Sequence, residues 1–221
     1  MIPDQSRPGD RGSVAEPVAT DGGADSGGTL VATTTRDGVL LAADERTTRG
    51  TVVRSEDVRK LAQVHPTGAM GATDDLGTAG AFVRSIRAEV DRYGTQRGEP
   101  MDLTALATVA AEELRSGDAP DVTFVLGGVD PDGPHVFALD RTLGVTAEPY
   151  VAVGTGRQVA LGVLETAAAS SLSMADARRL AGRALESAAE RDVRTGGGAS
   201  VAEITADGVE IREFDAIADL R

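Results

Sequence analysis

Short apolar and β-branched runs, broken by glycine and aspartate, dominate the chain from residue 29 to residue 73. The runs TLVATTT (29–35) and VLLAAD (39–44) flank the dipeptide Asp37-Gly38. Asp-Gly between two such runs predicts a β-hairpin, because glycine accepts the positive φ that a tight turn requires. Further short strands are indicated at residues 51–53, 58–64 and 68–73. This part of the chain is therefore predicted to be β-rich.

From Asp74 onward the apolar residues recur at intervals of three and four, which is the spacing of an amphipathic helix. The first apolar stripe consists of Leu76, Ala79, Phe82, Val83, Ile86 and Val90. Thr73 or Asp74 is expected to cap the start of this helix, and Gly94 is expected to end it. Residues 116–120 break a second predicted helix, over 102–115, whose apolar side consists of Leu103, Leu106, Val109, Ala110 and Leu114.

The second half of the chain repeats this order of elements. Apolar runs predict strands at 122–129, 135–140 and 150–153, helices at 158–170 and 173–191, and strands at 200–205 and 209–214. Strands, two helices, strands, two helices, strands is the order expected of two stacked sheets that are each covered by a helix pair. The sequence thus predicts an α+β fold, a four-layer αββα sandwich of two antiparallel sheets, in one domain spanning residues 28–221.

Residues 1–27 differ from the rest of the chain, because they are rich in Gly, Pro, Asp and Ser and have little periodic apolar content. This composition is typical of a disordered tail. The tail also lacks the charged-then-apolar layout of a signal peptide, and the chain contains no run of about 18 apolar residues. A secreted or membrane-spanning protein is therefore not expected.

Charge and cysteine content limit the expected cellular compartment and binding partners of the protein. The 221 residues include no cysteine, which suits a cytoplasmic protein without disulfides or thiolate-bound metal. The net charge of −13 disfavours nucleic acid and anionic membranes as partners, since both need a basic surface. An acidic excess is typical of a protein from a salt-rich cytoplasm, where salt screens the repulsion, but it also occurs in ordinary acidic soluble proteins.

Several motifs together resemble one family. They are DGVLLAAD followed by Arg46 and Lys60, then HPTGAM, GGVDPDG, GTGRQVALGVLE and ERDVRTG. From about Gly28 to Asp215 the chain resembles an archaeal, haloarchaeal-like β-type subunit of the 20S proteasome, in the N-terminal-nucleophile (Ntn) hydrolase superfamily. The resemblance implies the αββα sandwich, an N-terminal propeptide and a ring formed with α-type and β-type subunits. It also implies unfolded proteins as substrates if the chain is active, and no cofactor.

The resemblance implies an active site as well. In the family, the hydroxyl of an N-terminal threonine attacks the peptide bond, and the free amine of the same residue takes its proton. By motif, Asp44 would hold Lys60 beside that threonine, while Thr155, Asp192 and Thr195 would form a supporting hydrogen-bond group. Lys60 is the only lysine in the chain, yet taken alone it would be interpreted as a surface residue on a strand.

Two positions depart from the family pattern. The nucleophile should stand sixteen residues before Asp44, and that position is Gly28, which has no hydroxyl. The next residue, Thr29, is a candidate nucleophile only if a bulge turns it, because a shift of one residue on a strand points the side chain to the opposite face. The second departure is Asp74, at the position of the glycine that binds the oxyanion. Its carboxylate would repel the developing charge, although aspartate is also a good helix cap.

A substrate pocket is implied by position, lined by small or apolar residues that would also suit an ordinary core: Thr47, Val58, Ala62, Ala72, Leu76 and Gly80. The two histidines, His65 and His135, lie in turn-like contexts without metal-ligand spacing, so structural roles are expected and no metal is predicted.

Three functions are compatible with these residues. The first is a catalytically impaired proteasome β-type subunit, which keeps its N-terminal segment. The second is an active threonine endopeptidase that matures between Gly28 and Thr29, which predicts a chain beginning at Thr29. The third is a free-standing Ntn-fold binding module or amide hydrolase, which predicts a monomer or small oligomer that does not assemble with α-type subunits.

Overall fold

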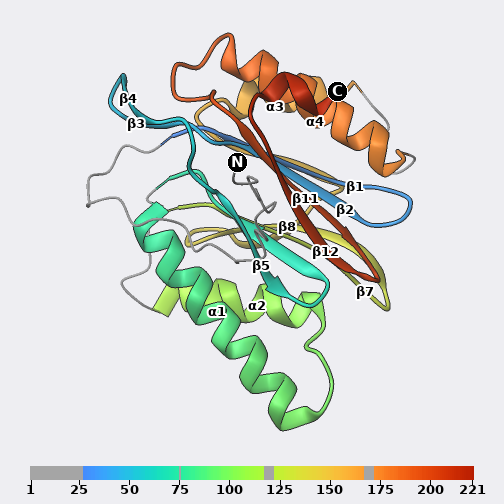
Figure 1. Cartoon of the computed structure of the whole chain (residues 1–221). Helices are drawn as coiled ribbons and strands as arrows, with labels where there is room; N and C mark the ends of the chain where they lie inside the picture. Colours follow the sequence, from blue (N-terminus) through green and yellow to red (C-terminus); the bar gives the residue numbers. More distant parts are fainter. Residues whose placement is uncertain (1–26, 75, 117–121, 167–171) are drawn as a thin grey trace, which may run out of the picture.

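A computed structural model describes residues 27–74, 76–116, 122–166 and 172–221. Two five-stranded antiparallel sheets lie face to face, with one pair of helices on the outside of each (Figure 1). The predicted α+β, four-layer αββα sandwich is confirmed. Of the predicted disordered tail, only Gly27 is among the described residues, and it is buried.

The first sheet has the strand order β10-β1-β2-β11-β12. Its central hairpin joins β1 (Thr29–Thr34) to β2 (Val39–Asp44), with Thr34 opposite Val39. The strand β11 (Ala199–Thr205) pairs with β2, and the edges are β10 (Tyr150–Gly154) and β12 (Gly208–Phe214). Residues 28–44 therefore run through the middle of this sheet.

The second sheet has the order β5-β6-β7-β8-β9. Its strands are β5 (Leu61–His65), β6 (Gly68–Gly71), β7 (Phe124–Asp130), β8 (Gly133–Asp140) and β9 (Gly144–Ala147). Between the sheets in sequence, β3 (Thr47–Arg49) and β4 (Val52–Ser55) form a separate hairpin that projects from the body (Figure 1).

Helices α1 (Leu76–Arg97) and α2 (Leu103–Ser116) cover the second sheet, and α3 (Arg157–Leu164) and α4 (Met174–Ala189) cover the first (Figure 1). Three buried clusters hold these layers together. One contains the predicted stripe of α1, including Phe82 and Ile86, against Phe124 and Leu126 of β7. Another packs α4 residues such as Leu180 and Leu185 on β1 and β2, and the third lies between the two sheets.

Several predicted details were wrong. Helix α1 continues through Gly94 and ends at Arg97, followed by Gly98 with φ of +74°. Gly38 has no positive φ; it is needed because a Cβ there would lie 1.9 Å from the Ile204 carbonyl oxygen. The short strands β3 and β9 were not predicted. Helix α1 begins at Leu76, so neither predicted cap, Thr73 or Asp74, directly precedes it. Of the predicted break at 116–120, residues 117–120 lie outside the described residues.

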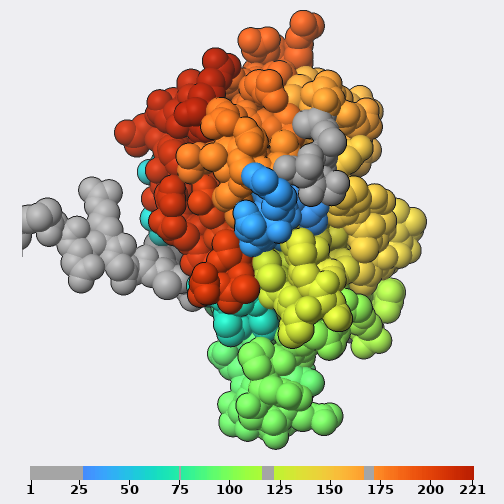
Figure 2. Space-filling view, turned by 90° about the vertical axis from the view of Figure 1, so that its right-hand side faces the viewer, coloured from blue at the N-terminus to red at the C-terminus, as the bar shows by residue number. Residues whose placement is uncertain are grey.

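Figure 2 shows the face on which the β1–β2 turn (blue) reaches the surface, between the orange α3–α4 layer and the yellow-green β7–β8 turn. The exposed residues of this turn are Arg36 and Asp37. In the described part of the chain, we find no helix with the length and apolar character needed to span a membrane.

Candidate active site

The centre of the site is an ion pair between the last residue of β2 and the residue that precedes β5. Lys60 Nζ lies 2.7 Å from Asp44 Oδ1, and both side chains are fully buried. Lys60 also donates to the carbonyl oxygens of Arg46 (2.7 Å) and Gly27 (3.1 Å). These three bonds use all three ammonium protons. The predicted Asp44–Lys60 contact is therefore present, and the lysine has no proton left to donate.

Asp44 accepts four hydrogen bonds in this position. Besides Lys60, its donors are the backbone amides of Thr29 (2.8 Å), Arg46 (3.2 Å) and Gly196 (2.9 Å). Burial raises the pKa of the Asp44 carboxyl, and the Lys60 ammonium and the donating amides oppose that rise. A buried ion pair needs such additional bonds to offset the loss of hydration.

A second group of polar side chains lies on the other side of Gly28. Asp192 Oδ2 accepts from the hydroxyls of Thr155 (2.5 Å) and Thr195 (2.7 Å). The Thr29 and Thr195 hydroxyls are 2.7 Å apart, and since Thr195 donates to Asp192, Thr29 is the donor of that pair. The three residues predicted as a supporting group thus form one network, which also includes Thr29.

Gly28 connects the two groups through its backbone. Its amide donates to Thr155 Oγ1 (3.2 Å), and its carbonyl oxygen accepts from the Thr155 amide (2.9 Å). Its φ is +128°, a conformation that residues with side chains rarely adopt. A Cβ at this position would lie 2.1 Å from Lys60 Nζ and 2.4 Å from Asp44 Oδ1. The direction in which a residue 28 side chain would point is therefore toward the ion pair.

Thr29 points elsewhere. Its side chain is fully buried, and its hydroxyl is bonded to Thr195 rather than to Lys60. Only its backbone amide contacts Asp44. This is the alternation expected of neighbouring residues at the start of a strand.

Asp74 lies shortly before α1 and accepts a hydrogen bond from the Thr73 hydroxyl (3.1 Å). Burial raises the pKa of the Asp74 carboxyl, while the Thr73 hydroxyl and the positive charges of Lys60 and Arg194 oppose that rise. Asp74 is thus close enough to the Asp44–Lys60 pair to interact with it electrostatically.

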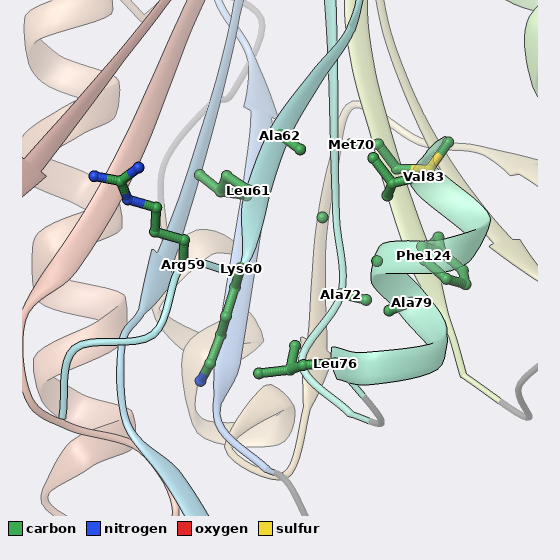
Figure 3. Close-up of a pocket in the computed structure, with 12 residues that line it drawn as sticks. Arg59, Lys60, Leu61, Ala62, Met70, Ala72, Leu76, Ala79, Val83 and Phe124 are labelled. Carbon is green, nitrogen blue, oxygen red and sulfur yellow. The ribbon is translucent and has the colours of Figure 1, made fainter. Parts of the chain in front are cut away.

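A small cavity of about 20 Å³ opens beside Lys60. Four of the six predicted pocket residues line it: Ala62, Ala72, Leu76 and Gly80. Thr47 and Val58 are buried but do not line it. Figure 3 shows Lys60 and Leu76 toward one end of the cavity and Met70, Val83 and Phe124 toward the other, while Arg59 points away. The end of the cavity opposite the lysine is therefore apolar.

Some groups that bind the Asp44–Lys60 pair could not be recognised from the sequence. The carbonyl oxygen of Arg46 and the amide of Gly196 bind the ion pair through backbone atoms. Gly27 packs so closely on Arg194 that a Cβ there would lie 2.5 Å from Arg194 Cδ. His135 bonds to Asp130 (2.8 Å) and His65 lies near Thr67 (3.1 Å), both away from this site. Among the described residues, no group of three or more His, Cys, Asp or Glu side chains is placed to hold a metal ion.

Comparison with known proteins identifies the family. The model of the proteasome subunit family matches residues 24–204, which is most of the chain. The chain belongs to the proteasome subunit family. It is 40% identical over 220 residues to "Proteasome subunit beta 2" of Haloterrigena turkmenica, covering 98% of this chain and 90% of that protein. It is also 43% identical over 195 residues to "Proteasome subunit beta" of Haloquadratum walsbyi, covering 88% and 80%.

A third relative, "Proteasome subunit beta" of Halobacterium salinarum, is 41% identical over 214 residues, covering 93% of this chain and 88% of the relative. The predicted resemblance to haloarchaeal β-type proteasome subunits is confirmed. Membership of the proteasome family also agrees with the stacked antiparallel sheets and four helices. The match begins before Gly28, so the positions around the ion pair lie within it.

Proposed function

We propose that this chain is a β-type subunit of the proteasome core particle that takes a place in the ring without cutting peptide bonds. The observation that carries the proposal is Gly28. Its missing side chain would point at Lys60 and Asp44, and no hydroxyl stands there to attack a substrate. Without that hydroxyl the chain also has no group to release its own N-terminal segment.

The contacts of Lys60 support the same conclusion. An ammonium that assists an N-terminal amine has to face that amine and the attacking hydroxyl. Here Lys60 instead donates to the Gly27 carbonyl oxygen, which belongs to the segment that cleavage would remove. The buried Asp44–Lys60 pair therefore binds the uncut chain, and its role in this subunit is to stabilise the fold.

Asp74 independently supports the proposal that the subunit does not cut peptide bonds. Catalysis of acyl transfer needs hydrogen-bond donors aimed at the oxyanion, and removal of one such donor costs roughly 10²–10³ in kcat. A half-buried carboxylate near Lys60 contributes negative charge where negative charge would develop. A chain with this residue would be a poor protease even if residue 28 were a threonine.

The remaining candidate nucleophile is Thr29. Maturation before Thr29 would place its new amine next to Asp44, since the amide already lies 2.8 Å away. Its hydroxyl, however, donates to Thr195 on the far side of the strand from Lys60. We therefore favour the impaired subunit over an active peptidase that begins at Thr29.

We further propose α-type and β-type proteasome subunits as the ring partners and the cytoplasm as the location. The haloarchaeal relatives are named as proteasome β subunits, which supports a ring over a free-standing Ntn-fold protein. Size-exclusion chromatography with and without α-type subunits tests this part: co-elution in a large particle supports it, and a persistent monomer contradicts it.

The intact mass of the chain from its native host tests the impairment. We expect a chain that retains residues 1–28 and does not react with a threonine-directed electrophile. A mass that corresponds to a start at Thr29, with labelling that Thr29→Ala abolishes and Thr33→Ala leaves unchanged, would contradict the proposal. Thr33 is a matched control because it is also a buried threonine of β1.

Repair of both positions provides the converse test. Gly28→Thr with Asp74→Gly should gain cleavage before residue 28 and peptidase activity in the assembled particle. Gly28→Thr alone should remain about 10²–10³-fold slower, because the carboxylate is still beside the oxyanion position. Lys60→Met in the doubly repaired chain should abolish the gain. Equal activity of the single and double variants would show that Asp74 is not a defect.

A further inference from the structure

Glu45 is a buried acidic residue directly after Asp44, and the site described above does not use its carboxylate. Only 5% of the residue is exposed, and Oε1 has no hydrogen-bond partner within the described part of the chain. A buried polar atom without a partner is costly, and for a carboxylate the cost falls when it takes up a proton. Glu45 therefore needs an explanation.

The strand register shows what lies beside it. Ser200 of β11 is opposite Ala43 of β2 and Glu213 of β12, and cross-strand neighbours share a face of the sheet. Glu45, two residues after Ala43, lies over Gly198, where a Cβ would be 2.5 Å from Glu45 Oε2. The Ser200 hydroxyl is buried and also has no partner among the described residues. Two unpartnered oxygens thus share this face.

The charges around Glu45 are mostly negative. Three acidic residues act on the Glu45 carboxylate: Glu213 from β12, Asp57 from the segment before β5, and Asp44 from the end of β2. Arg59 is the positively charged residue that opposes them. Arg59 is paired with Glu213. Burial, followed by repulsion from Glu213 and Asp57, raises the pKa of the Glu45 carboxyl to about 7.

The backbone of Glu45 connects the segments that hold the Asp44–Lys60 pair. Its amide donates to the Gly198 carbonyl oxygen (3.0 Å), and its carbonyl oxygen accepts from the Val58 amide (3.0 Å). Gly196, two residues from Gly198, donates to Asp44, and Lys60 follows Val58 by two residues. A movement of the Glu45 side chain would therefore reach both ends of the ion pair.

We propose that Glu45 is a proton-dependent switch: the neutral, protonated carboxyl stays buried on the face that it shares with the unpartnered Ser200 hydroxyl, and the ionised carboxylate is repelled by Glu213 and Asp57 and loosens the junction that holds Asp44 and Lys60. The proton comes from solvent and no other group is consumed. The switch concerns the fold around the pair and does not depend on whether the subunit is catalytic.

The sign of the effect follows from linkage. A carboxyl with a raised pKa in the folded state contributes stability that is fully present below its unfolded pKa of 4.5 and is lost as pH rises to about 7. Glu45→Gln mimics the protonated form and removes this dependence. Relative to that variant, the unfolding equilibrium constant of the natural chain should rise about 50- to 100-fold between pH 5 and pH 8.

Chemical denaturation of the natural chain and Glu45→Gln at pH 5, 6, 7 and 8, at fixed ionic strength, measures this ratio. The chain's only lysine gives a second measurement, because labelling by an amine-reactive probe at Lys60 can be read by mass spectrometry. We expect Lys60 labelling of the natural chain to increase above pH 7 more than in Glu45→Gln. A constant ratio with identical labelling profiles would overturn the proposal.

Glu213→Gln keeps the test decisive if Glu45→Gln does not fold. This side chain is 44% exposed, and its removal takes away a negative neighbour and frees Arg59, so the transition should move to lower pH. An unchanged midpoint would overturn the proposal. A last control replaces the potassium ions of the buffer by tetramethylammonium at equal ionic strength. The pH midpoint of the stability change should stay the same. A shifted midpoint would show that an alkali cation, not a proton, neutralises Glu45.

Discussion

Gly28 has no side chain, and the charged groups of Lys60 and Asp44 occupy the space that a side chain would need. Lys60 Nζ and Asp44 Oδ1 lie 2.1 and 2.4 Å from the position that a Cβ of residue 28 would take, which is too close for a side chain to fit between them. The φ of +128° lets the uncut chain continue to Gly27, whose carbonyl oxygen completes the bonds of Lys60. In this conformation of the uncut chain, a side chain at residue 28 would have to displace Lys60 or Asp44.

Gly28→Ala should destabilise the protein for two separable reasons, the strain of a positive φ and the displacement of Lys60. Strained backbone conformations cost of order 1–3 kcal/mol each. Gly133→Ala is the matched control, because Gly133 has φ of +120° but no atom within 4 Å of an added Cβ. In urea unfolding, Gly28→Ala should lose more stability than Gly133→Ala. Equal losses would show that the ion pair tolerates the methyl group.

The side chains of this site could be predicted from the sequence, but its backbone contacts and the burial of Glu45 could not. Asp44, Lys60, Thr155, Asp192 and Thr195 were predicted from the resemblance of their motifs to the proteasome family. The structure brings them together around Gly28, although their roles stay predictions. The backbone acceptors and donors were not predictable, because every residue carries the same amide and carbonyl groups. The burial of Glu45 was missed because it depends on its close approach to Gly198.

At the scale of elements, the apolar stripe predicted the buried residues of α1 correctly, but the glycine expected to end the helix was the wrong one. All six predicted stripe residues of α1 are buried, yet the helix passes Gly94 and continues to Arg97. Glycine ends a helix only where the chain takes a positive φ, and that happens at Gly98. The strand β9 was missed because four residues at a sheet edge acquire their structure from pairing with β8 rather than from a pattern of their own.

Two alanine substitutions test this account of α1. Gly94→Ala should stabilise the protein by about 0.5–1 kcal/mol, because alanine favours the helix interior and its methyl group would meet only the Glu99 carbonyl oxygen, 3.9 Å away. Gly98→Ala should destabilise it, because Gly98 has φ of +74°. Thermal unfolding of both variants measures the difference. Destabilisation by Gly94→Ala would mean that the helix does not continue through residue 94.

At the scale of the whole molecule, charge is the dominant feature. Among the described residues, Asp44 and Glu45 are the only acidic residues that are buried, so the groups that give the net charge of −13 lie mostly nearer the surface and repel one another there. Such repulsion destabilises the compact state, and salt screens it, since the Debye length falls from about 10 Å at 0.1 M to about 3 Å at 1 M.

We therefore expect the Tm of the isolated chain to rise by several degrees between 0.1 and 1 M KCl, because about 1 kcal/mol shifts the Tm of a domain of this size by roughly 2–4 °C. Asp91→Lys with Glu112→Lys changes two exposed acidic residues on α1 and α2 and should reduce the rise. Screening predicts this dependence on charge, whereas a general salt effect on apolar burial acts at any net charge. A Tm that does not change with KCl, or an equal rise in both proteins, would show that surface repulsion does not limit the stability of this fold.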